Sequence, residues 1–268
     1  MKHPHSPLRL GALAIAGLLL SVSAAYAHFG MVIPSAPTVM EARGANISVA
    51  LKFWHPFENV GMNLETPRAF QVFHGGKAQD LLGALKKGTE RGMSVFEAAY
   101  SIKAPGLYTF VMEPQPYFEE SEDCYIIHYT KAYVDAFGDD EGWDEPLGLK
   151  TEIVPFVRPG ALYAGNVFQG QVLNAGEPVP FAEVEVEWYP GPDKKGIAPF
   201  ESMVTQTVKA DSRGMFVYAA PRAGWWGFAA LQEGEEKIPY QGKDKDVEIG
   251  AVLWLYFHPF ADAGALGK

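Results

Sequence analysis

The feature that most constrains the fold of this chain is its rhythm of short strand-like stretches separated by turn residues. In Asn46–Trp54 apolar residues alternate with others, which places every second side chain from Ile47 to Phe53 on one face of a strand. Further strands follow at intervals of roughly 8–12 residues, a spacing typical of β-sandwiches. The strongest helix signal, Asp80–Lys87, is long enough for only one or two turns. The sequence therefore predicts an all-β protein.

Two β-sandwich domains are expected after the N-terminal segment. The run Pro155–Pro159 is typical of a linker, so we place the domains at residues 28–157 and 158–268. In the first domain, Ala104-Pro105-Gly106 predicts a tight turn that joins residues 94–103 and 107–113 as a hairpin. In the second, the pattern G-x-V-L-x-x-G-x-P-V-x-x-A-x-V-x-V over residues 170–186 resembles transthyretin-like or collagen-adhesin B-type modules, which implies an immunoglobulin-like sandwich.

The first 27 residues have the plan of a cleavable signal peptide. Lys2 and Arg9 precede an apolar run over Leu10–Ser23, and Ala25-Tyr26-Ala27 is a small-x-small cleavage site. The apolar run is shorter than the ~20 residues that a membrane-spanning helix needs. We therefore expect export to the periplasm without a membrane anchor, and a mature chain that begins at His28.

Charge and cysteine content exclude several classes of function. The formal net charge is −10, and loss of Lys2 and Arg9 would take it to about −12, so nucleic acid is not an expected partner. A single cysteine, Cys124, excludes an intramolecular disulfide. Nucleotide-binding glycine loops, a G-x-S-x-G elbow and an H-E-x-x-H motif are all missing from the sequence, and we predict that the chain is not an enzyme.

Histidines are the candidates for chemistry. A histidine at the mature N-terminus offers a metal two nitrogens, its α-amine and its imidazole Nδ1. Two more histidines each precede a proline at the end of a predicted strand, where ligands commonly bind. Another lies within the strand that begins at Cys124, and a glutamate follows one of the His-Pro pairs. The predicted metal ligands are His28, His55, His128, His258 and Glu58.

Each of these residues also has a purely structural interpretation. His28 could simply follow the cleavage site, and His55 could pack in an aromatic cluster with its neighbours. His128 could be a core histidine with a ring nitrogen bonded to a neighbouring backbone. His258 is followed by a tail of mostly small residues that is expected to be flexible, which suits a surface residue, and Glu58 could be an exposed loop glutamate.

Imidazoles and an amine, with few carboxylates and no thiolate pair, suit Ni²⁺, Co²⁺, Cu²⁺ or Zn²⁺. The mature start His28–Pro34, the segment His55–Glu58 and the block Glu141–Leu149 together resemble an exported family of unknown function that is labelled as the periplasmic component of ABC-type cobalt or nickel uptake systems. This resemblance implies binding of nickel or cobalt, with His28 and His55 as ligands, and delivery to a membrane metal transporter. Copper and zinc are the other metals that the donors allow.

Two further functions remain open. A copper oxidase of the histidine-brace kind would also begin with a mature histidine followed closely by glycine and proline, as His28 is here. A carbohydrate-binding or adhesion sandwich without metal would use aromatic side chains, with the pair Trp225-Trp226 as a candidate sugar-stacking surface. Adjacent strand residues point to opposite faces, so only one of the two could serve a single platform.

Overall fold

A computed structural model describes residues 28–41 and 45–260 of the 268-residue chain. The predicted signal peptide, residues 1–27, lies outside the described residues. The regular structure of the described part consists of strands and three short 3₁₀ turns, so the prediction of an all-β fold is confirmed. None of the described helices is long and apolar enough to span a membrane. The 3₁₀ turns are η2 (Leu82–Ala84), η3 (Pro159–Ala161) and η4 (Glu201–Met203).

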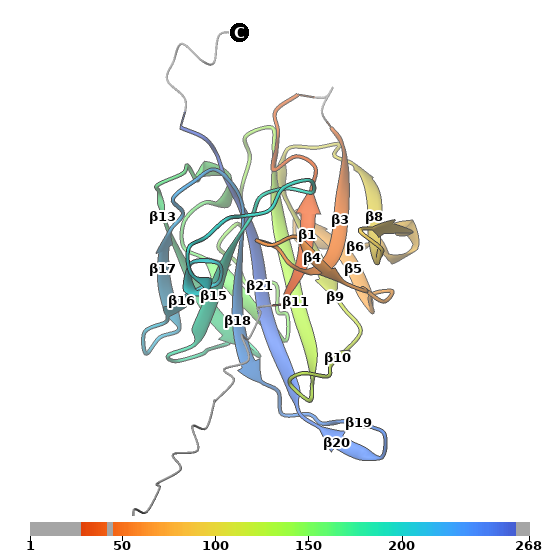
Figure 1. The fold of residues 1–268 in the computed structure, drawn as a ribbon. Helices are drawn as coiled ribbons and strands as arrows, with labels where there is room; N and C mark the ends of the chain where they lie inside the picture. Colours follow the sequence, from red (N-terminus) through yellow and green to blue (C-terminus); the bar gives the residue numbers. More distant parts are fainter. Residues whose placement is uncertain (1–27, 42–44, 261–268) are drawn as a thin grey trace, which may run out of the picture.

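A long central sheet of 10 strands runs through the molecule (Figure 1). It contains strands from both halves of the sequence. Its main path is β16 (Gln206–Lys209), β15 (Glu183–Tyr189), β18 (Gly224–Glu233), β21 (Val247–Phe257), β11 (Cys124–Ala136), β9 (Gly106–Glu113), β5 (Ala69–His74) and β6 (Lys77–Asp80), while β10 (Tyr117–Glu119) and β2 (Thr38–Val39) pair with β11 off this path.

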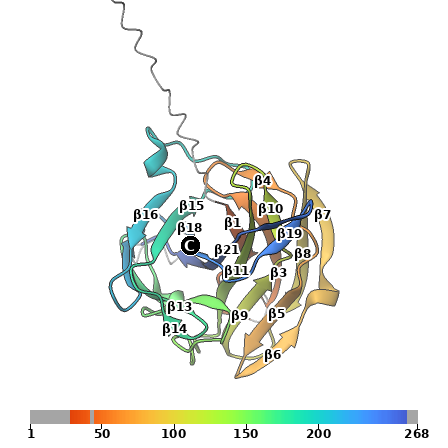
Figure 2. The same cartoon turned by 90° about the horizontal axis from the view of Figure 1, so that it is seen from below.

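Two smaller sheets cover the central one, and a separate hairpin extends from it. The first is a 5-stranded sheet of β1 (Phe29–Pro34), β3 (Asn46–His55), β8 (Met93–Ser101), β7 (Lys86–Glu90) and β4 (Val60–Met62). The second is a 4-stranded sheet of β12 (Thr151–Pro155), β13 (Val167–Asn174), β14 (Glu177–Pro178) and β17 (Met215–Ala219). The hairpin is β19 (Ile238–Tyr240) with β20 (Lys243–Lys245), and Figure 2 shows the layers from below.

The two halves form two β-sandwiches that share the central sheet. Along β21, Val252 and Trp254 pack into the core beneath the 5-stranded sheet, whereas Leu253 and Leu255 pack into the core beneath the 4-stranded sheet. Such a strand is buried on both faces, which explains its almost continuous apolar sequence. The boundary near residue 158 stays a prediction, and one hydrogen-bonded sheet crosses it.

The predicted hairpin at residues 94–113 is wrong. Strand β8 pairs with β3 and β7 in the 5-stranded sheet, whereas β9 pairs with β11 and β5 in the central sheet. The turn at Pro105-Gly106 therefore carries the chain from one layer to the other. The burial of β9 from Gly106 to Met112 explains this, because a strand covered on both faces belongs inside the sandwich.

A buried ion pair links strand β11 of the central sheet to strand β12 of the 4-stranded sheet. Lys131 Nζ on β11 lies 2.6 Å from Glu152 Oε2, and both side chains are almost fully buried. Glu152 also accepts hydrogen bonds from the backbone N–H groups of Leu147, Gly148 and Leu149. Strand β12 and the preceding loop thus depend on one carboxylate.

Replacing one partner of this pair should destabilise the protein strongly. Lys131→Met leaves the buried Glu152 carboxylate without its counter-charge, and we expect a loss of about 3–5 kcal/mol in the free energy of unfolding. Urea unfolding followed by tryptophan fluorescence measures this. The control is Lys209→Met, which breaks the exposed Lys209–Glu183 pair and should cost less than about 1 kcal/mol. Equal losses in the two variants would contradict the role of the buried pair.

Candidate functional site

The site begins where β1 and β3 lie side by side. These strands are antiparallel with Phe29 opposite Trp54, so the residue before β1 and the last residue of β3 lie next to each other. These residues are His28 and His55, whose ring centroids are 4.5 Å apart with an interplanar angle of 51°. The structure therefore brings two of the predicted ligands together at one end of the sandwich, and their role in metal binding stays a prediction.

A carboxylate lies against Nε2, one of the two ring nitrogens of His28. Glu119 Oε2 on β10 lies 3.1 Å from His28 Nε2, and both side chains are largely buried. Burial and the neighbouring His55 lower the pKa of His28 to about 4. Near neutral pH the His28 ring is thus uncharged, and donation from Nε2–H to Glu119 leaves the lone pair on Nδ1. Sequence analysis missed Glu119, although it opens the acidic run Glu119–Asp123 that precedes β11.

His128 lies in the core beside this pair. Its side chain is 1 % exposed, and the backbone N–H of Gly30 donates to its Nδ1 over 3.3 Å. The ring is in edge contact with Phe53, with centroids 5.7 Å apart. Nε2 has no hydrogen-bond partner among the described residues and lies 3.6 Å from Glu248 Oε1. This is the core-histidine arrangement that the sequence left open, although the charges of His128 and Glu248 also act on His28.

Two glycines make room for the His128 ring. A Cβ at Gly250, which is opposite His128 on β21, would overlap the ring carbon Cδ2. A Cβ at Gly30 would overlap the Thr130 hydroxyl and touch the His128 Cβ. Strand β1 can therefore lie directly against β11. This packing sets the position of His28, the residue just before β1.

The other two predicted ligands are His258 and Glu58. His258 follows β21 at the opposite end of the parallel pair β11/β21, eight residues beyond the position opposite His128, which corresponds to about 26 Å along a strand. Its ring contacts Tyr256, and its backbone N–H donates to Leu162. Glu58 follows β3, and its charge acts on the buried Glu187. The structure therefore places His258 and His28 at opposite ends of the sandwich, and the role of His258 as a metal ligand stays a prediction.

The described residues contain no group of three or more His, Cys, Asp or Glu side chains arranged to hold a metal ion. The candidate metal donors that side chains supply are therefore the two adjacent imidazoles of His28 and His55. A third nitrogen would come from the α-amine of His28, which becomes available only when the chain begins at that residue. Amine and imidazole nitrogens are suitable donors for borderline divalent metals.

Acidic side chains continue from this site along β15. Glu185 and Glu187 lie on the face of the central sheet that carries His128 and Glu248. Burial raises the pKa of both carboxyls to about 7, and for Glu185 the charges of Glu248 and Glu187 add to this effect. Glu187 accepts hydrogen bonds from the backbone N–H of Phe57 and from the Thr205 hydroxyl. This face is therefore negative at pH 8 and partly neutralised at pH 6.

Sequence comparison identifies the family of this chain. Residues 25–234 match the profile of a family described as a domain of unknown function (DUF4198). The chain belongs to this family. A comparison with curated protein sequences finds no match.

Solved structures with some likeness are β proteins. The D0-D1 domain of intimin has 13 % identity and a TM-score of 0.25, covering 87 % of this chain and 100 % of that one. The adhesin InvE of Yersinia pseudotuberculosis has 9 % identity and a TM-score of 0.25, over 83 % of this chain and 58 % of that one. A putative carbohydrate binding protein from Bacteroides uniformis has 10 % identity and a TM-score of 0.22, over 83 % of this chain and 100 % of that one. Likeness at this level says nothing about activity.

The raised pKa of Glu187 makes a pH-dependent contribution to stability. In the unfolded chain this carboxyl ionises near its usual pKa of 4.5, whereas in the folded protein it ionises near 7. Its contribution to stability is therefore present at low pH and is lost as the pH rises from 4.5 to 7. Glu187→Gln removes this dependence. Between pH 5 and pH 8 the free energy of unfolding should therefore fall by up to about 3 kcal/mol less in the variant than in the parent.

Urea unfolding at pH 5, 6, 7 and 8 measures the difference between the two proteins. Glu183→Gln is the control, because Glu183 lies on the same strand and is exposed. Parallel pH profiles for the parent and Glu187→Gln would contradict the raised pKa.

Proposed function

We propose that this chain binds a divalent transition-metal cation through the two imidazoles of His28 and His55 and the α-amine of His28. The observation that carries the proposal is the placement of Glu119 on His28 Nε2, 3.1 Å away. A carboxylate that accepts a hydrogen bond from one ring N–H leaves the lone pair of the other ring nitrogen for a metal and fixes the ring orientation. That free nitrogen is Nδ1, the one that can chelate together with the α-amine.

The electrostatics of the site support the same conclusion. A metal binds the neutral form of imidazole, and the lowered pKa of His28 keeps its ring neutral above about pH 4. The acidic groups Glu119 and Glu248 act on the same ring and would offset the charge of a bound cation. Nickel and cobalt are the metals that the family resemblance implies. The affinity of such a nitrogen site for divalent metals follows the usual order, in which copper binds more tightly than nickel or cobalt.

In this proposal the metal is cargo and the chain performs no reaction. Export to the periplasm and delivery to a membrane transporter rest on the signal-like segment 1–27 and on the family resemblance. The carbohydrate-binding alternative loses its candidate platform, because Trp225 is 9 % and Trp226 is 2 % exposed. Neither ring can present a flat stacking surface to a sugar.

Isothermal titration of a chain that begins at His28 tests the proposal. We expect at least one of Ni²⁺, Co²⁺, Cu²⁺ and Zn²⁺ to bind with a dissociation constant below 1 μM, which corresponds to about −8 kcal/mol. One alanine added before His28 removes the chelating amine and should weaken binding at least about 10-fold, as should His55→Gln. Glu119→Ala should weaken it about 10–100-fold by releasing the ring of His28.

Two matched variants serve as controls in this titration. His258→Gln removes a histidine at the other end of the sandwich, and Glu120→Ala removes the exposed carboxylate next to Glu119. Both should bind like the parent. Binding weaker than 1 μM for all four metals, or an equal loss in His258→Gln and His55→Gln, would contradict the proposal.

A further inference from the structure

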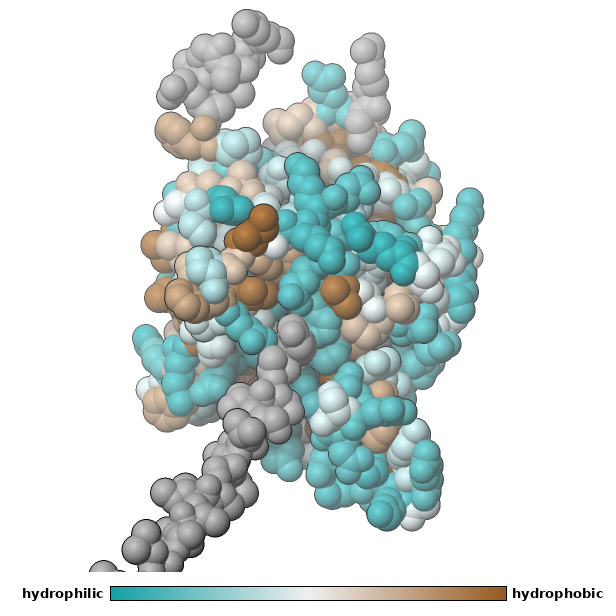
Figure 3. Space-filling view, in the orientation of Figure 1, coloured by the Kyte–Doolittle hydropathy of each residue, from teal (hydrophilic) through white to brown (hydrophobic). Residues whose placement is uncertain are grey.

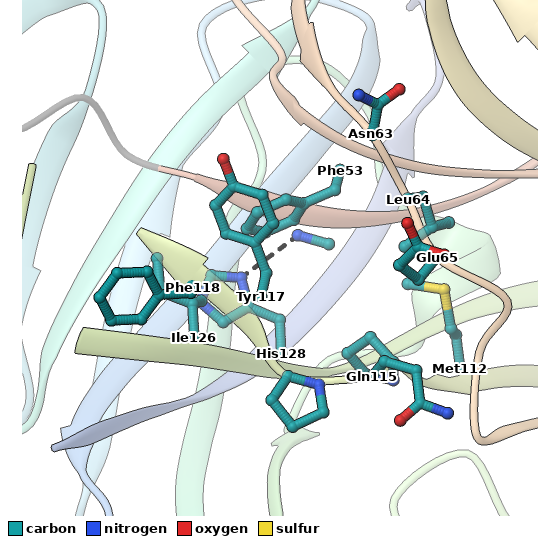
Figure 4. Close-up of a pocket in the computed structure, with 13 residues that line it drawn as sticks. Phe53, Asn63, Leu64, Glu65, Met112, Gln115, Tyr117, Phe118, Ile126 and His128 are labelled. Carbon is teal, nitrogen blue, oxygen red and sulfur yellow. Dashed lines mark hydrogen bonds between the residues drawn. The ribbon is translucent and has the colours of Figure 1, made fainter. Parts of the chain in front are cut away.

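A pocket of about 230 Å³ lies next to the histidines. It opens between the segment that follows β4 and the segment that joins β9 to β10, and its inner wall comes from β3 and β11. Figure 4 shows Tyr117, Phe118 and His128 on one side of it and Leu64, Glu65 and Met112 on the other. The pocket thus lies between the 5-stranded sheet and the central sheet.

The lining of the pocket changes from apolar inside to polar at the mouth. Phe53, Leu64, Met112 and Ile126 are all buried and form the apolar interior. The exposed side chains that line it are polar: Asn63, Glu65 and Gln115. An apolar cavity with a few polar groups at its entrance is the usual form of a small-molecule site, in which the polar groups set the orientation of the ligand. The face of the protein drawn in Figure 3 is mainly hydrophilic, and most of its apolar side chains gather on the side of β13, β15, β16 and β17.

Aromatic side chains connect this pocket with the imidazole pair. Phe53 stacks on His28 with ring centroids 5.5 Å apart, and Tyr117 lies 6.4 Å from the same ring. Phe53 and Tyr117 are also in contact with each other, at 5.0 Å and 59°. Both rings line the pocket, so a molecule in it would meet their free faces and edges.

We propose that this pocket binds a small single-ring aromatic molecule that carries one hydrogen-bonding group. The volume supports one substituted ring, because an apolar cavity of about 150 Å³ is enough for benzene. Phe53 and Tyr117 offer tilted and edge-on contacts, which aromatic rings prefer. The ring enters first, and the hydrogen-bonding group stays at the mouth near Asn63, Glu65 and Gln115. This site does not depend on a bound metal and goes beyond the proposed metal binding.

Titration with 4-methylphenol, followed by NMR of ¹³C-labelled methionine methyl groups, tests the proposal in the metal-free full chain. We expect the Met112 methyl signal to shift saturably, with a dissociation constant below about 1 mM. The Met203 methyl group lies on the surface in η4 and should not shift. Met112→Leu assigns the signal. No saturable shift of Met112, or equal shifts of Met112 and Met203, would overturn the proposal.

Variants and related probes test the site and the ligand class. Leu64→Trp fills the pocket and should weaken binding at least 10-fold, whereas Leu82→Trp in the partly exposed turn η2 should bind like the parent. 4-Methylcyclohexanol has the same size without the aromatic ring and should bind at least 5-fold more weakly. Equal affinity for the two molecules would overturn the aromatic class, and a larger Met112 shift with methyl β-glucoside would overturn it in favour of a sugar.

Discussion

The structure depends on the parallel pairing of β11 with β21. Residues 125–132 pair with residues 247–254, so a strand from the first half of the chain lies beside the last strand of the described residues. Both strands are buried on their two faces, and each face contributes to a different core. Since a β-strand buries alternate residues on opposite sides, most side chains of both strands are apolar, and the buried polar ones of β11, such as His128 and Lys131, have polar partners. The two sandwiches therefore form a single three-layered body.

The same pairing determines the geometry of the candidate site. His128 lies opposite Gly250, and the missing side chain of that glycine provides the space for the imidazole ring. The ring in turn accepts a hydrogen bond from Gly30, and Trp254 Nε1 donates to the Gly30 carbonyl oxygen over 2.8 Å. Strand β1 is thus held through both backbone groups of Gly30, its N–H and its carbonyl oxygen. His28 and the start of β1 are placed by the core of the molecule and not by a surface loop.

Local patterns in the sequence predicted the strands well and their partners poorly. The alternation over residues 46–54 corresponds to β3, and the strand expected to begin at Cys124 and to contain His128 is β11. Alternation says nothing about which strands pair. The sequence therefore could not predict that the chain passes from the 5-stranded sheet to the central sheet between β8 and β9, nor that β11 pairs with β21. The nearness of His28 and His55 depends on the register of β1 and β3. Glu119 and Glu248 come from strands distant in sequence, and the acidic run that Glu119 opens does not indicate which residues it contacts.

Diffraction from crystals of the chain that begins at His28, soaked with nickel or cobalt and recorded at the metal absorption edge, tests the central claim most directly. The account predicts one anomalous peak between His28 and His55, about 2.0–2.2 Å from the His28 amine, His28 Nδ1 and a ring nitrogen of His55. Glu119 should remain on His28 Nε2. A peak at His258 or at the acidic side chains of β15, with none at His28, would contradict it.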